Sequence, residues 1–119
     1  MKSKSIVQER LDAGKNRLDI ISREIESSRM STKDVSNGLR QVGAMLESAQ
    51  KFVKTDTNVK FATQIEQKLE SSMKYLSGTI KALDGEGITN KNLGANLTQV
   101  GRIIESVQEF VDLEIETLG

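Results

Sequence analysis

Residues 39–53 read LRQVGAMLESAQKFV, and residues 97–111 read LTQVGRIIESVQEFV. Nine of these fifteen positions are identical, at a constant offset of 58 and without a gap. Four of the identities are polar, and chance similarity between two amphipathic helices would match the apolar positions but not these. We therefore interpret the chain of 119 residues as two tandem copies of one unit, residues 1–58 and 59–116.

Both stretches also have the apolar spacing of a helix that packs along one side. Apolar or small residues recur at alternating steps of three and four, an average of 3.5 residues that keeps one seam facing a partner helix. The seam positions are Val7, Leu11, Gly14, Leu18, Ile21 and Ile25; Val35, Leu39, Val42, Leu46, Ala49 and Val53; Ala62, Ile65, Leu69, Ser72, Leu76, Thr79 and Leu83; and Leu93, Leu97, Val100, Ile104, Val107 and Val111. They predict four helices, near residues 5–28, 31–54, 57–84 and 89–118, and no strands.

Helix-start and helix-stop signals lie between these segments. Ser31 and Thr89 are good N-cap residues, because their hydroxyls can accept hydrogen bonds from free backbone N–H groups. Met30 and Ile88 precede the caps and can each pack on an apolar residue one turn into the helix. The sequence DGEG at residues 84–87 supplies glycines that can adopt a positive φ and end the third helix.

Short connections favour an all-α fold in which consecutive helices run antiparallel. The simplest arrangement is a four-helix bundle of two helical hairpins, forming a single domain over residues 1–119 with coiled-coil-like seams. In the alternative, the hairpins stay apart and each needs another chain to cover its apolar face. Long helices with few aromatic residues also favour burial by self-association, so we expect a homo-oligomer.

The composition limits the chemistry that the chain can perform. It contains no His and no Cys, which excludes Cys/His zinc fingers, Ser-His-Asp triads and thiol redox sites. The net charge is zero, but eleven basic against eight acidic residues give residues 1–58 a charge of +3, and six against nine give residues 59–119 a charge of −3. Opposite charges favour contact between the copies or between chains. No apolar run is long enough to span a bilayer, so we expect no membrane contact and a cytoplasmic location.

A second repeated pattern lies beside the seam on the second helix of each copy. A glycine, a glutamate and a glutamine are spaced i, i+4 and i+7, which places each trio along one edge of its helix. The first edge is Gly43, Glu47 and Gln50, and the second edge is Gly101, Glu105 and Gln108. A helical glycine costs about 1 kcal/mol relative to alanine, so its repetition suggests close approach of another backbone or of a partner residue. Two interpretations stay open: a tight helix crossing inside the bundle, and a protein-interaction edge used twice.

Nucleic-acid binding is the alternative function. Lys2, Lys4, Arg10 and Arg17 give the first copy a basic bias. A neutral chain with four aromatic residues nevertheless lacks the basic footprint and the stacking platforms of a general nucleic-acid binder. Pairs of carboxylates four residues apart could offer oxygen ligands to a metal, but they lie mostly off the seam and are more simply a solvated face.

The sequence thus favours a non-enzymatic helical interaction or scaffold protein. We expect it to act by protein–protein binding and self-association, through the two edges. No catalytic residue, cofactor or metal ligand is predicted.

Overall fold

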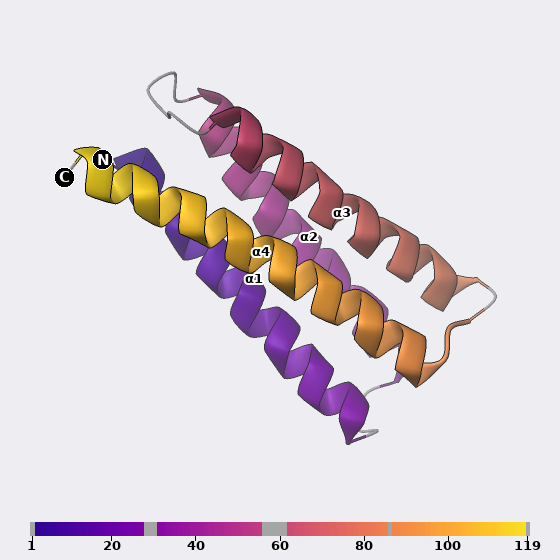
Figure 1. Cartoon of the computed structure of the whole chain (residues 1–119). Coiled ribbons are helices and arrows are strands. Elements are labelled where there is room, and N and C mark those ends of the chain that lie inside the picture. Colours follow the sequence, from indigo (N-terminus) through magenta and orange to yellow (C-terminus); the bar gives the residue numbers. More distant parts are fainter. Residues whose placement is uncertain (1, 28–30, 56–61, 86, 119) are drawn as a thin grey trace.

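The computed structural model describes residues 2–27, 31–55, 62–85 and 87–118, and side chains within residues 6–27, 31–54, 62–85 and 87–112. The four helices are α1 (Lys2–Glu26), α2 (Thr32–Thr55), α3 (Ala62–Asp84) and α4 (Asn90–Leu118). They pack lengthwise into an elongated body of 44 × 22 × 18 Å (Figure 1). The described residues contain no strand. The prediction of four helices without strands is confirmed.

The helix bounds agree closely with the predicted ones where both can be compared. Helices α2 and α4 each begin one residue later than predicted, and α3 ends at the predicted residue. Helix α1 begins at Lys2 rather than near residue 5. The apolar pattern starts only at Val7, since Lys4 occupies the preceding seam position, so apolar spacing does not mark the first turn of this helix. The predicted end of the first helix at residue 28 and start of the third at residue 57 lie outside the described residues.

The core is made of the seam positions. All of them are buried except Ala62, which is half-buried at the start of α3. The apolar ones form one cluster with contributions from all four helices. Because the seams bury one another within a single chain, their burial does not require a second copy of the protein.

Each helix packs against two neighbours: α1 and α3 both contact α2 and α4. The end of α4 lies beside the start of α1 (Figure 1), where Gln8 Nε2 donates a hydrogen bond of 2.7 Å to Asp112 Oδ1. Where the start of α2 packs against the end of α3, Asp84 accepts a 2.8 Å hydrogen bond from Ser36 Oγ and pairs with Arg40. These polar contacts tie the first copy to the second at both of their shared interfaces.

The contact between the helices of each copy contains one pair of complementary residues. In the first copy, a Cβ built on Gly38 would lie 2.8 Å from Ile21 Cδ1. The Ile21 side chain therefore fits against α2 only because Gly38 has no side chain. The equivalent positions of the second copy are Thr79 and Asn96, and there Asn96 Nδ2 donates a hydrogen bond of 3.2 Å to Thr79 Oγ1. A large apolar residue on a glycine in the first half of the chain thus corresponds, at the offset of 58, to a hydrogen-bonded polar pair in the second half.

The predicted helix starts and the predicted turn are present. Ser31 Oγ accepts a hydrogen bond from the Asp34 amide, and Thr89 Oγ1 accepts one from the Asn92 amide, each at 3.2 Å. Ile88 packs against the core, whereas Met30 lies outside the described residues. Gly87 has a φ of +92°, the conformation for which glycine is favoured.

Among the described side chains, three polar ones lie in the core, and each makes a hydrogen bond. Besides Ser36, Ser72 Oγ donates to the Leu69 carbonyl at 2.7 Å and Thr79 Oγ1 donates to the Tyr75 carbonyl at 2.8 Å. Their burial therefore leaves no hydroxyl unsatisfied, which would otherwise cost about 1–3 kcal/mol.

Within the described part of the chain, no helix is both long and apolar enough to cross a membrane.

Candidate functional site: two equivalent helix edges

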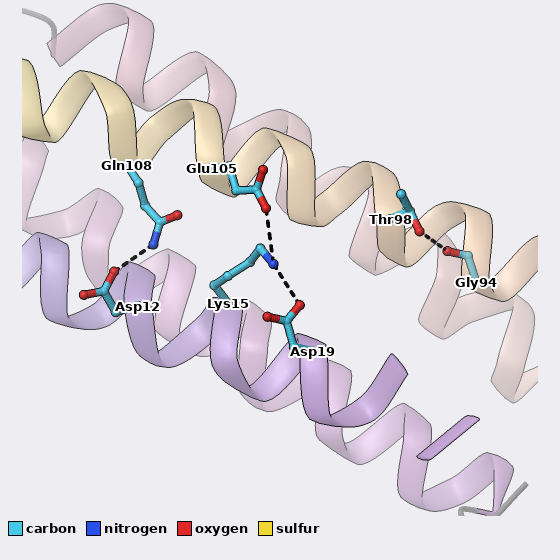
Figure 2. Close-up of polar contacts among 7 residues, drawn as sticks. All are labelled: Asp12, Lys15, Asp19, Gly94, Thr98, Glu105 and Gln108. Carbon is cyan, nitrogen blue, oxygen red and sulfur yellow. Dashed lines mark hydrogen bonds and ion pairs between the residues drawn. The ribbon is translucent and has the colours of Figure 1, made fainter. Parts of the chain in front are cut away.

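The second edge lies against α1, and all of its residues face that helix. Figure 2 shows Lys15 extending from α1 toward Glu105 of α4, with Nζ 3.4 Å from Oε1. One turn further along, Gln108 Nε2 donates a hydrogen bond of 2.7 Å to Asp12 Oδ1. A Cβ on Gly101 would lie 3.6 Å from Cε of Lys15. The stem of Lys15 thus passes over the glycine, and its ammonium group reaches the glutamate.

Lys15 is the centre of this arrangement. Its side chain is 19% exposed, and Nζ also lies 2.8 Å from Oδ1 of Asp19, on its own helix (Figure 2). Burial alone would lower the pKa of Lys15, but the hydrogen bonds and negative charges of Asp19 and Glu105 outweigh that effect and raise its pKa above the ordinary value. Lys15 is therefore held as a cation between two carboxylates.

The first edge has a different environment. Apart from its two chain neighbours and the nearby backbone of its own helix, no atom would lie within 4 Å of a Cβ on Gly43. The ion pair described for Glu47 is with Lys51 on the same helix, at 3.9 Å. Gln50 Nε2 donates a long hydrogen bond of 3.4 Å to the backbone carbonyl of Glu66 on α3. Only Gln50 thus has a described hydrogen bond to the neighbouring helix.

At the glycine and the glutamate, the two edges differ in the residue at the equivalent position of the neighbouring helix. Met73 lies 58 residues after Lys15, at its equivalent position in the repeat, and belongs to α3, which packs against α2 as α1 packs against α4. Met73 packs against the core cluster instead of lying over Gly43. The Glu47 and Glu105 side chains are both 61% exposed. The two glutamates are therefore equally exposed, but among the described side chains a lysine from another helix reaches only Glu105.

The repeated glycine suggested close approach of another backbone or of a partner residue, and the two glycines differ in what they meet. Gly101 meets the Lys15 and Leu18 side chains at ordinary van der Waals distances, and Gly43 meets nothing within 4 Å. At the second edge, Glu105 and Gln108 do contact α1, as the interpretation of a helix crossing inside the bundle expects, but Gly101 meets side chains and not another backbone. The crowded glycine is Gly38, which the repeat does not single out because its equivalent in the second copy is Asn96.

The other candidate residues lie apart from these edges. Arg10 and Arg17 are exposed on α1, whereas the side chains of Lys2 and Lys4 lie outside the described ones. In the described part of the chain, no group of three or more Asp, Glu, His or Cys residues is placed to hold a metal ion. A surface hollow of about 390 Å³ between the end of α1 and the start of α4 includes Glu26 and Gly94 and no residue of either edge.

Sequence reasoning missed the residues that face the edges. Lys15 and Asp12 resemble ordinary exposed charges of α1 in the sequence, and Met73 resembles a core residue. Comparing each position with its equivalent in the other copy would have found the substitution of Met73 for Lys15. A comparison of the chain with protein-family models, curated proteins and solved structures gives no match, so the functional proposal depends on the geometry of the two edges.

Proposed function

We propose that the chain is a single-domain, antiparallel four-helix bundle that arose by duplication of one helical hairpin. Contacts between the start of one helix and the end of a neighbouring helix support the antiparallel course: Gln8 with Asp112 across α1 and α4, and Ser36 with Asp84 across α2 and α3. The constant offset of 58 supports the duplication, because it relates the seams, the caps and the two edges. Duplication makes the α2–α3 interface equivalent to the α1–α4 interface, so the two can be compared residue by residue.

We further propose that the bundle acts as a non-enzymatic interaction protein, through the first edge. One observation carries this proposal: the second edge is covered by Lys15 of α1, whereas the first edge keeps open space at Gly43 and an exposed carboxylate at Glu47. At the second edge, the glycine and the glutamate both contact Lys15 of another helix. At the first edge, no contact with another helix is described for either residue. A surface of this kind is available to a protein partner.

The test compares the same charge reversal at the two edges. Full-length wild-type, E47R and E105R proteins are immobilised and exposed to a lysate of the cells that encode the chain. We expect a protein that binds the wild type and E105R to bind E47R about tenfold less, a loss of about 1.4 kcal/mol of binding free energy. Mass spectrometry of the bound fraction gives the ratio, and it also shows whether the partner is a second copy of the chain.

E105R is the matched control, because it changes the same residue type at the equivalent position of the covered edge. Far-ultraviolet circular dichroism must show unchanged helix content in both variants. Equal binding to all three proteins, or an equal loss with E47R and E105R, would contradict a role for the first edge.

A further inference from the structure

We propose that the first edge binds a lysine side chain presented by a protein partner, in the manner in which the second edge holds Lys15. This inference rests on the proposed function, since it names the chemistry of the partner at the same edge. The template for it is an interaction inside the same molecule, between residues at positions equivalent to those of the open edge.

The covered edge shows how a lysine is held. Lys15 Cε would be 3.6 Å from a Cβ on Gly101, and Nζ lies 3.4 Å from Glu105 Oε1. The glycine leaves room for the aliphatic stem, and the carboxylate one turn away accepts the ammonium group. This use of both parts of a lysine is favourable, because the stem covers apolar surface while the charge stays paired.

The open edge offers the same two features without a lysine. Gly43 leaves the space for a stem, and Glu47 is as exposed as Glu105. Met73 cannot supply the charge, because its thioether is neutral and packs against the core. Lys51 approaches Glu47 along its own helix at 3.9 Å and leaves the space at Gly43 open. The missing component is a cation at the end of a flexible apolar stem.

The partner must be a protein rather than a free amine. An exposed pair between one carboxylate and one ammonium group contributes only about 0–1 kcal/mol, which cannot hold a small cation at cellular concentrations. A protein adds contact with the neighbouring surfaces of α2 and α3, and it presents its lysine already positioned. The charge pair then determines which surface is recognised rather than supplying most of the affinity.

One substitution can fill the site from within. M73K places a lysine on α3 where α1 has Lys15, and the partner's lysine would then compete with an intramolecular one. We expect M73K to bind the partner about tenfold less than the wild type, with unchanged helix content. The control M73L, which keeps an apolar side chain of similar size, should bind the partner as the wild type does.

Carbodiimide coupling then identifies the bound group. The reagent activates a carboxylate, and an amide forms only with an amine in contact. The bait carries K51R, because arginine does not couple and the competing amine on α2 is removed. Mass spectrometry should find Glu47 joined to a lysine of the captured partner, with Lys15 joined to Asp19 or to Glu105 as the internal control. In purified M73K carrying K51R, Glu47 should be joined to the introduced lysine.

The outcomes separate this inference from the proposed function. Binding that requires Glu47 but persists in M73K, or that gives no link from Glu47 while the control link forms, would overturn the lysine proposal and leave the interaction function standing. No Glu47-dependent binding at all would overturn both. A link from Glu47 to a lysine of a second copy would replace the separate partner by self-association and so contradict the proposal.

Discussion

Lys15 shows how one side chain decides whether a helix edge belongs to the fold or to the surface. It covers Gly101 and pairs with Asp19 and Glu105, whereas Met73 at the equivalent position turns into the core. The difference is one of chemistry and not of exposure, since the Glu47 and Glu105 side chains are equally accessible.

The raised pKa of Lys15 gives a pH dependence with a definite sign. The folded protein binds this proton more tightly than the unfolded chain, whose lysine has the ordinary value of 10.5. The stabilisation is therefore complete below that pH and is lost as the pH rises through the higher pKa of the folded state. We expect the wild type to lose stability relative to K15M above about pH 10.5, as measured by urea unfolding between pH 7 and 11.5. Parallel curves for the two proteins would contradict the pairing.

The glycines of α2 should respond in opposite ways to alanine. Gly43 has open space at its Cβ position, so G43A should raise the free energy of unfolding by about 0.5–1 kcal/mol through helix propensity alone. Gly38 would place its Cβ 2.8 Å from Ile21 Cδ1, and overpacking of this kind costs about 1–3 kcal/mol, more than the propensity gain. Urea unfolding of both variants checks this, and a stabilised G38A would show that Ile21 moves aside freely.

At the scale of the elements, the α1–α2 contact and the equivalent α3–α4 contact are made by different kinds of residue pair. Ile21 on Gly38 fills space between α1 and α2, and Thr79 with Asn96 makes a hydrogen bond between α3 and α4. Each pair requires both of its residues, so a residue of one copy should not fit opposite the residue of the other.

This complementarity predicts strong coupling in a double-mutant cycle. T79I should destabilise the protein by about 1–3 kcal/mol, because the larger side chain meets Asn96 and removes its acceptor. N96G in the same molecule recreates the pair of the first copy and should recover most of the loss. The expected coupling energy is about 1–2 kcal/mol in unfolding experiments. Additive effects of the two substitutions would mean that the pairs are independent of each other.

The extent to which the sequence predicts the structure follows from which signals are local. Heptad spacing located the seams, including the polar positions Ser72 and Thr79, because every seam residue faces the same interior. Capping chemistry located Ser31 and Thr89, because an N-cap hydroxyl accepts its hydrogen bond from an amide of its own helix, three residues away. The partners of the two edges were not predictable in this way, since whether Lys15 or Met73 covers a glycine depends on side-chain direction between helices.

At the scale of the whole molecule, the two halves of the chain have opposite formal charges and meet along α1 with α4 and α2 with α3. The polar contacts of Lys15, Asp12 and Gln8 hold the first of these interfaces. Ser36, Arg40 and Asp84 hold the second near one of its ends. The first edge lies along this second interface, in a part where the described polar contacts between helices reduce to that of Gln50.

The most direct test of this difference between the edges is carbodiimide coupling of the purified protein in the D19N variant, which removes the carboxylate that competes for Lys15. Mass spectrometry of the digested monomer should find Glu105 joined to Lys15, an interhelical pair at 3.4 Å. Glu47 should be joined to Lys51 of its own helix or to no lysine at all. A link from Glu47 to a lysine of α1, α3 or α4, or the absence of the link between Lys15 and Glu105, would contradict the account.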